Sequence, residues 1–313
     1  MLLRQFPNLQ WLKAQAEKGF HEARLPDGRV VPVQGWPTVV LNVQTREVLR
    51  DNIKGPLSLF VNLSGESHAT AGKHRARVDS STYFLSNNEQ YYTLEVDADA
   101  PVELFNIHFG QEFAPQVAAA FTKGTSAALE SPETNGQATH FYNQLYPRTA
   151  EFNQLVKGLA NHPNINSNAL LREEYLGNIM ALLLKEHQQL QQHIEQLPAV
   201  RVAVREEVYQ RLARAVDYMH SHYEADLSLD ELAAVACLSK FHFLRLFRAA
   251  YNLTPSRYLQ ALRLEKARVL LRTTQLAVSE VSLATGFGHP NAFIRAFGKA
   301  HGCSPGQFRA QVA

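Results

Sequence analysis

The chain has 313 residues, of which 45% are hydrophobic and 19% are charged. This length allows two domains with a core each, and the composition is that of a globular rather than a disordered protein. The formal net charge of +2 hides an asymmetry, because residues 239–313 carry eleven Lys or Arg against two Asp or Glu, whereas the rest carries 20 bases against 27 acids. A basic end favours a polyanionic partner, although a solvated basic surface would have the same composition.

The sequence predicts no export signal, no membrane-spanning helix and no zinc site. Arg4, Pro7 and Asn8 interrupt the N-terminal apolar residues, and no stretch approaches the ~20 apolar residues that a membrane helix needs. Cys237 and Cys303 lack the spacing of zinc ligands, so we expect buried thiols of a reduced, intracellular protein. The expected location is the cytoplasm.

The first third of the chain alternates apolar and polar residues, the pattern of short β-strands. Turn-rich pieces separate the strands, among them Pro26-Asp27-Gly28, Gly35-Trp36-Pro37 and Asp97-Ala98-Asp99. Many short strands predict a small β-barrel or sandwich over about residues 1–112. The predicted strands are Arg29–Val33, Thr38–Val43, Leu57–Ser64, Lys73–Val78, Thr82–Leu85, Tyr91–Val96 and Val102–Phe109.

Helices are predicted after the barrel. The first covers Phe113–Lys123 and precedes a polar loop over Gly124–Ala138. One long helix is predicted over Asn168–Gln196, and its apolar stripe packs either on the barrel or on the same helix of a second subunit. The stripe consists of Leu171, Tyr175, Ile179, Leu182, Leu183, Leu190 and Ile194.

Leu197-Pro198-Ala199 ends the long helix and is the predicted domain boundary. The predicted fold class is therefore α+β. Residues 1–197 form a domain with a barrel over about 1–112 and helices over about 113–197, and residues 198–313 form an all-α domain.

Within the second domain one helical pattern occurs twice, 50 positions apart, with Leu232–Tyr258 aligned to Ser282–Phe308. Each copy has a short apolar helix, a break, and a second helix with two phenylalanines four residues apart. This is the outline of a helix-turn-helix, whose second helix can enter a DNA major groove. The matched pairs are Phe243 with Phe293, Arg245 with Arg295, Phe247 with Phe297 and Pro255 with Pro305.

Capping residues and apolar stripes define the two second helices. Ser228 and Glu231 form a predicted capping box, Ser239 is expected to cap the second helix of the first copy, and Pro290 suits the first turn in the second copy. The buried stripes are predicted to be Phe243, Leu246, Phe247 and Ala250, and then Phe293, Ala296, Phe297 and Ala300.

The face of each second helix that is turned about 100° away from the buried stripe is the predicted DNA-binding face. Arg245 and Arg295 are candidates for bidentate contacts to guanine, with a phosphate contact or a surface ion pair as the alternative. Asn291 can pair with adenine in the same manner. The predicted DNA-binding residues are Ser239, Lys240, Phe241, His242, Leu244, Arg245, Arg248, His289, Asn291, Ile294, Arg295 and Lys299.

Four of these residues have other roles open to them. Leu244 and Ile294 either touch thymine methyl groups or belong to a wider core, and His242 and His289 are expected to reach phosphates or cap a helix. Between the two copies, Ser256–Thr273 is predicted to be an amphipathic helix. If it holds the recognition helices close to the ~34 Å repeat of B-DNA, both enter successive major grooves on one face.

The C-terminal third resembles the AraC/XylS transcriptional regulators. The resemblance is carried by LAAVACLSKFHFLRLFRAAYNLTPSRYLQALRLEKARVLL and by ATGFGHPNAFIRAFGKAHGCSPGQFR at Ala284–Arg309. It implies a sequence-specific, double-stranded DNA-binding regulator, more often an activator, with two helix-turn-helix motifs and a linker helix. On this likeness the base-facing positions hold Phe241, Leu244, Arg245, Asn291, Ile294 and Arg295.

The chain also departs from the family pattern. Ala277 stands where many relatives have a capping serine, and Leu244 and Ile294 are more apolar than the common choices, which leaves the bases read open. The first two thirds resemble the family's sensor architecture, a cupin-like barrel with dimerising helices. A homodimer is therefore expected, with RNA polymerase as a further expected partner.

The barrel offers no metal-ligand pattern, because His68, His74 and His108 are scattered, so no metal and no cofactor are predicted. A barrel filled by its own side chains and one enclosing a small organic effector both fit. The candidate pocket residues are Tyr83, Phe84, Tyr91, Tyr92, Phe105 and His108.

No catalytic constellation occurs in the sequence, so an enzyme is not predicted. The leading interpretation is a DNA-binding regulator controlled at its N-terminal domain by a small molecule or a partner. The alternatives are a ligand-independent architectural DNA binder and a cupin-type enzyme with a DNA-binding tail.

Overall fold

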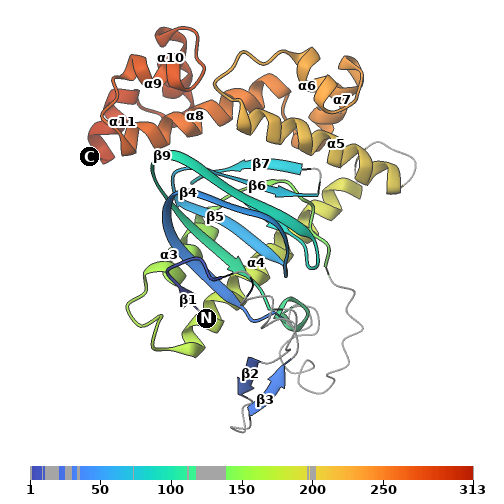
Figure 1. Ribbon diagram of the computed structural model, residues 1–313. Coiled ribbons are helices and arrows are strands. Elements are labelled where there is room, and N and C mark those ends of the chain that lie inside the picture. The colour runs from blue at the N-terminus through green and yellow to red at the C-terminus, as the bar shows by residue number, and fades with distance from the viewer. Residues whose placement is uncertain are drawn as a thin grey trace. The chain divides into compact units, whose positions relative to one another are not determined.

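The computed structural model describes residues 2–8, 10, 21–24, 30–33, 36–72, 74–110, 113–117, 139–195, 197 and 202–312. The chain divides into two compact units, Met1–Gln192 and His193–Ala313 (Figure 1). The first contains a β-sheet with helices, and the described elements of the second are all helices, joined by turns and loops. The predicted fold class is confirmed. The predicted boundary at Leu197-Pro198-Ala199 stays a prediction, because residues 198–201 lie outside the described part of the chain.

An eight-stranded sheet forms the centre of the first unit, in the order β1-β4-β9-β5-β8-β10, with β6 paired to β9 and β7. A separate antiparallel ribbon pairs β2 (His21–Arg24) with β3 (Val30–Val33). The strands of the main sheet are β1 (Leu2–Leu3), β4 (Val39–Lys54), β5 (Ser58–Ser64), β6 (Ser67–Ala71), β7 (His74–Val78), β8 (Thr82–Ser86), β9 (Tyr91–His108) and β10 (Leu145–Pro147).

Strand β9 organises this sheet. It pairs with β4 along both of its halves, whereas its other edge is shared between β5 near His108 and β6 near Tyr92. The sheet therefore curves around an interior where Phe60, Phe84 and Leu104 pack together. Because successive strand residues point to opposite faces, their neighbours point outward against the helices. The interior and the helix-covered outer face therefore hold separate apolar clusters, and Val39, Leu41 and Val43 of β4 form a further small cluster.

The structure differs from the predicted strands at three places. The predicted turn Asp97-Ala98-Asp99 lies inside β9, where a register shift opposite Thr45 and Glu47 accommodates the extra residues as a bulge. Strand β4 continues far beyond Val43 because its second half pairs with β9 although several of its side chains are exposed. Strand β6 was not predicted, since its alternation is of small and polar residues. The predicted turn Pro26-Asp27-Gly28 lies outside the described residues.

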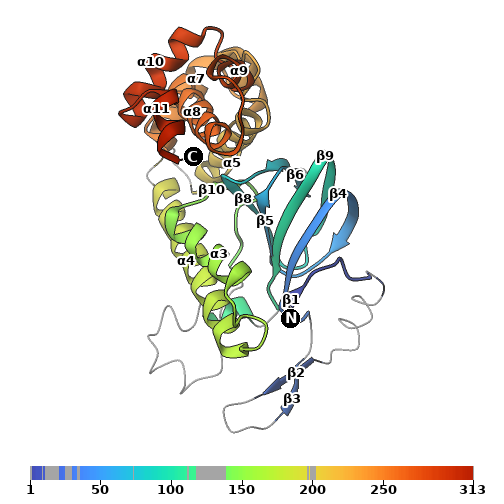
Figure 2. The ribbon, with the colours of Figure 1, turned by 90° about the vertical axis from the view of Figure 1, so that its left-hand side faces the viewer.

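Helices α3 (Ala150–Asn161) and α4 (Ala169–Glu195) lie along one face of the sheet (Figure 2). The long predicted helix is confirmed as α4. Its Ile179 and Leu183 are buried with sheet residues such as Ile107, so the stripe packs on the barrel of its own chain. Of the shorter predicted helix, residues 113–117 are helical, and the rest, with the predicted loop, lies outside the described residues. Helix α3 was not predicted.

After the end of α4, the described residues of the second unit form helices α5 to α11. In the chain they are α5 (Val202–Ser221), α6 (Leu229–Val235), α7 (Lys240–Tyr251), α8 (Pro255–Thr273), α9 (Val278–Ala284), α10 (Pro290–His301) and α11 (Pro305–Val312). None of the helices in the described residues has the length and apolar character to cross a membrane.

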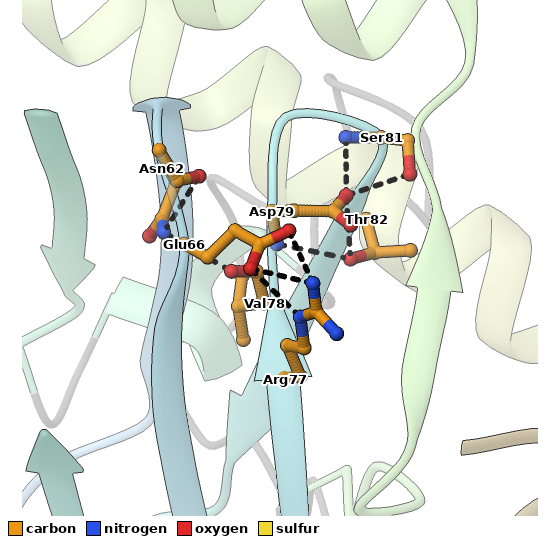
Figure 3. A network of polar contacts seen from close by, with 8 residues as sticks. Asn62, Glu66, Arg77, Val78, Asp79, Ser81 and Thr82 are labelled. Atoms are coloured by element: carbon orange, nitrogen blue, oxygen red, sulfur yellow. Dashed lines mark hydrogen bonds and ion pairs between the residues drawn. The ribbon is translucent and has the colours of Figure 1, made fainter. Parts of the chain in front are cut away.

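A polar network ties β5 to β7 and the turn that follows it (Figure 3). Arg77 makes two hydrogen bonds of 2.8 Å to the carboxylate oxygens of Glu66. Asn62 Nδ2 donates to the Val78 carbonyl at 3.1 Å. The buried Asp79 then accepts from the backbone N–H of Ser81 at 2.8 Å and from its hydroxyl at 2.7 Å, which closes the turn.

Replacing Asp79 tests this turn. We expect Asp79→Ala to lower the free energy of unfolding by about 1–3 kcal/mol, because the half-buried Ser81 donors lose a charged acceptor. Asp51→Ala is the matched control, since Asp51 is exposed and accepts one hydrogen bond, from Thr93 Oγ1 at 2.8 Å. A change within about 0.5 kcal/mol is expected there. Urea unfolding measures both, and equal losses would contradict the assignment.

Candidate nucleic-acid interface

The two predicted helix-turn-helix units are present as α6–α7 and α9–α10, but their repeat is not uniform. Helices α7 and α10 begin 50 residues apart, at Lys240 and Pro290, as predicted. Helices α6 and α9 begin 49 residues apart, at Leu229 and Val278, so the predicted alignment of the first helices is off by one residue. The second turn holds one residue more, beside Gly288.

The turn of each unit contains a residue in the left-handed conformation, Cys237 with φ 52° and Gly286 with φ 75°. In each, the next residue donates its backbone N–H to a carbonyl of the preceding helix: Leu238 to Ala233 and Phe287 to Ser282, at 2.9 and 3.0 Å. Cys237 is exposed and Cys303 is half-buried, so the prediction of buried thiols is wrong. Cys237 belongs to the turn rather than to the core.

Helix caps follow the prediction in part. Ser228 Oγ accepts from the Glu231 N–H at 3.1 Å, and the Glu231 carboxylate accepts from the Tyr218 hydroxyl at 2.6 Å. Ser239 occupies the N-cap position of α7 without a side-chain cap bond, contrary to the prediction. At Ala277, where a capping serine is missing, Glu280 accepts the N–H of Ala277 at 2.6 Å and supplies part of the cap.

The stripe predicted for α7 is buried as a whole: Phe243, Leu246, Phe247 and Ala250. In α10, Phe293 and Phe297 are buried, Ala296 is half-buried and Ala300 is exposed, so the prediction for Ala300 is wrong. The two helices have different neighbours: α7 packs on α5, α6 and α8, whereas α10 packs on α8, α9 and α11.

The predicted DNA-binding faces of α7 and α10 are largely open to solvent. Phe241 is 85% exposed, an unusual environment for a large aromatic side chain. Leu244 is half-buried and Ile294 is 39% exposed, so neither is a core residue. His289 occupies the N-cap position of α10 without a side-chain cap bond. The remaining exposed candidates are Ser239, Lys240, His242, Arg245, Arg248, Asn291, Arg295 and Lys299.

Several cations of this basic region serve the fold. Arg263 donates to the carbonyls of Tyr223 and Ala225, both at 2.7 Å. Lys266 is buried, with its ammonium 5.4 Å from the centre of the Tyr223 ring. Arg309 donates to the carbonyl of Leu276 at 2.6 Å. These charges are not available to a partner in the way that the composition implied.

Other cations are paired or free. Lys240 lies 2.7 Å from Asp230, and Arg268 lies 3.0 Å from Glu265. Within the described residues, the cations of this region with neither a carboxylate nor a carbonyl bound to the side chain are Arg245, Arg248, Arg257, Arg272, Arg295 and Lys299. Most of these lie on α7 and α10, so the free positive charge concentrates on the two second helices.

Helix α8 connects the two units and contributes to both cores. At its start, the Tyr258 ring meets Phe247 of α7 edge-on, with centroids 5.7 Å apart. Towards its end, Ala267 and Leu271 are buried with Phe293 and Phe297. The predicted amphipathic helix is confirmed, and Figure 1 shows it running from the α6–α7 pair to the α9–α10 pair.

A second contact joins the two helix-turn-helix units at Gly286. A Cβ atom there would lie 2.8 Å from the Tyr223 carbonyl oxygen and 2.7 Å from that of Glu224, both in the loop between α5 and α6. Arg263 of α8 binds the same Tyr223 carbonyl. The turn of the second unit, the loop of the first and the linker helix therefore meet at one point, which fixes the two second helices relative to each other.

This contact predicts a graded glycine series. Gly286→Ala is expected to lower the free energy of unfolding of the helical unit, His193–Ala313, by about 2–5 kcal/mol. The cost combines left-handed strain with overlap between the new Cβ atom and the backbone. Gly302→Ala, with φ 73° and open space around it, should cost only the strain, about 1–2 kcal/mol. Gly288→Ala, which meets nothing within 4 Å, should change little. Urea unfolding of the three variants measures the order, and equal costs at Gly286 and Gly302 would contradict the contact.

The candidate pocket residues of the barrel separate into different environments. Tyr92 and His108 line a cavity of about 40 Å³. Tyr83 and Phe105 point to the helix-covered face, and Phe84 is buried in the barrel interior. Tyr91 is 54% exposed. Neighbouring residues differ because successive side chains of a strand point to opposite faces, and composition alone does not show which face each one takes.

The cavity also has walls that the sequence did not indicate. They include Phe6, Trp36, Arg50 and Asn106, which are far apart in the chain and meet where β4, β5 and β9 curve together. Among the described residues, no group of three His, Cys, Asp or Glu side chains is arranged to hold a metal ion.

Comparisons place these features among known proteins. Residues 232–311 match the family described as a helix-turn-helix domain. The chain is 39% identical, over 127 residues, to the HTH-type transcriptional regulator CdhR of Pseudomonas aeruginosa, which covers 40% of this chain and 35% of CdhR. The chain thus spans about a third of the length of this curated relative.

Two solved structures each match about a third of this chain. The DNA-binding domain of AdpA, solved in complex with a target DNA, is 33% identical, covers 32% of this chain and 91% of its own, and has a TM-score of 0.32. A transcriptional regulator from Chromobacterium violaceum, of the proteins containing an AraC-type DNA-binding domain, is 32% identical, covers 34% and 94%, and has a TM-score of 0.33.

Proposed function

We propose that this chain, which belongs to the AraC family of DNA-binding transcriptional regulators, reads double-stranded DNA with α7 and α10 in two successive major grooves. The observation that carries the proposal is that both helices rest on the single helix α8 and turn their free cations outward. One polypeptide then reads two sub-sites.

Each exposed residue has a proposed role. Arg245 and Arg295 bind guanine through O6 and N7, and Asn291 binds adenine. Leu244 and Ile294 touch thymine methyl groups, since their partial exposure leaves side-chain surface for a base. The proposed phosphate contacts are Ser239, Lys240, His242, Arg248, His289 and Lys299. The exposed Phe241 gains an apolar or stacking contact when DNA covers it.

Control is proposed to reside in the barrel. A small molecule bound in the cavity shifts the population that is competent for DNA. We propose a homodimer that raises the apparent affinity, action as an activator that contacts RNA polymerase, and a place in the cytoplasm, where the DNA is. The apolar stripe of α4 is used within its own chain, so a dimer interface needs other surface. No catalytic role is proposed for the barrel.

The direct test is binding of the purified full chain to fragments upstream of its own and neighbouring genes, against a random duplex, over a salt titration. One fragment is expected to bind about 10³-fold more tightly, with affinity falling steeply as salt rises. Affinity that ignores sequence on every fragment would instead identify an architectural binder.

The arginine variants test base reading. Arg245→Ala and Arg295→Ala should each cost about 1–3 kcal/mol on the specific fragment and relax preference at one position. Lys240→Ala should weaken all sequences alike. Arg268→Ala, which removes an exposed cation paired with Glu265 outside the second helices, is the control for net charge. Equal weakening of random and specific DNA by the two recognition-helix variants would rule out base contacts.

A further inference from the structure

We propose that the barrel cavity binds a small organic monocarboxylate, with the carboxylate at Arg50 and the carbon chain against the apolar wall. This inference rests on the proposed control through the barrel, for which it names the class of ligand. It is supported by the polar groups in the cavity wall, in particular a cation without an anion and an amide donor without an acceptor.

Arg50 is a half-buried cation without an anion. Its Nη2 donates to the Pro7 carbonyl, and its guanidinium carbon lies 5.0 Å from the centre of the Phe6 ring. No carboxylate of the described residues pairs with it. Burial lowers the pKa of Arg50, but a guanidinium stays charged in proteins. A carboxylate from outside offers the planar, bidentate partner that this charge lacks.

Asn106 supplies a second open donor. Its side chain is fully buried, and its Oδ1 accepts from the Val61 N–H at 3.3 Å. Its Nδ2 has no hydrogen-bond partner among the described residues. Buried donors in native proteins are normally satisfied, so this amide in the cavity wall calls for an acceptor. An oxygen of the ligand fits that requirement.

His108 adds no positive charge. Ser58 Oγ donates to the Pro56 carbonyl at 2.8 Å and also lies 2.8 Å from His108 Nδ1, so Nδ1 carries the proton and donates to Ser58. Nε2 is then the unprotonated nitrogen. Burial, with Arg50 nearby, lowers the pKa of His108 to about 4, which keeps the ring neutral near pH 7. The wall thus has an acceptor beside its donors.

The number of charged side chains in the cavity wall indicates which class of anion can bind. Arg50 is the one charged side chain among the described lining residues. A dicarboxylate would bring a second charge without a partner, and an amino acid would bring an ammonium group without a carboxylate to hold it. A monocarboxylate leaves neither group unpaired.

The size and lining of the cavity define the rest of the ligand. The apolar part of the wall includes Val39, Leu41, Ile53, Phe60 and Leu94. The cavity holds about 40 Å³, and since one water-sized sphere takes about 10–15 Å³, it has room for roughly three such spheres. A carbon chain of a few atoms fits, and a straight-chain acid such as butyrate is the natural probe.

The test is calorimetric titration of the full chain, without DNA, with straight-chain carboxylates from acetate to octanoate and with butyramide as the uncharged control. We expect saturable binding that is strongest near butyrate and absent for butyramide. Trp36 lines the cavity, so its fluorescence in a Trp11→Phe background should report the same binding.

Variants separate the role of Arg50 from a structural effect. Arg50→Gln should weaken butyrate binding about tenfold or more, and Arg50→Lys, which keeps the charge, should restore part of it. Arg46→Gln, an exposed arginine on the same strand, should bind as the parent does. Equal affinity for butyrate and butyramide, no binding of any of the acids, or unchanged binding by a folded Arg50→Gln chain would overturn the proposal.

A separate measurement distinguishes this inference from the proposed function. DNA affinity is measured with and without saturating butyrate. Binding of butyrate without any effect on DNA affinity would support the site and refute control through it. Sequence-specific DNA binding by a chain that binds none of the acids would refute the site and leave DNA reading intact.

Discussion

The sharing of helix α8 between two helix-turn-helix cores is the constraint on which the second unit depends. Neither unit is complete alone, because α7 needs the Tyr258 end of α8 and α10 needs its Leu271 end. A helix is stiff over this length, so burying both ends fixes the separation of the recognition helices. The contact of Gly286 with the loop before α6 adds a second tie and limits rotation about the helix axis. The two small cores thereby form one rigid DNA-binding unit.

Charge in this unit is divided between folding and recognition. Arg263, Lys266 and Arg309 are directed at carbonyls or an aromatic ring, where they stabilise the loops around α8. The free cations lie mainly on α7 and α10, beside exposed apolar side chains such as Phe241. Free cations give affinity for phosphates, whereas the side chains among them read sequence. The barrel cavity shows the opposite arrangement, because Arg50 is the one charged side chain among its described lining residues and most of the others are apolar.

The helices with a regular apolar spacing could be predicted from the sequence, whereas features that depend on how strands pair could not. The phenylalanine pairs of the duplicated stripes, the linker helix and α4 follow from spacing, because an amphipathic helix buries its apolar face. The continuity of β9 through Asp97-Ala98-Asp99 did not follow, since a bulge is set by the register with β4. The extra turn residue at Gly288 was hidden because it interrupts the repeat only within the turn. Arg50 and Asn106 carry no local signal, because the curvature of the sheet brings them together.

The measurement that tests the central claim most directly is hydroxyl-radical footprinting of the full chain on the fragment that it binds most tightly. If α8 holds α7 and α10 as one reader, two protected stretches should appear on one face of the duplex, centred about 10 base pairs apart. A single protected stretch, or two stretches on opposite faces, would contradict the account.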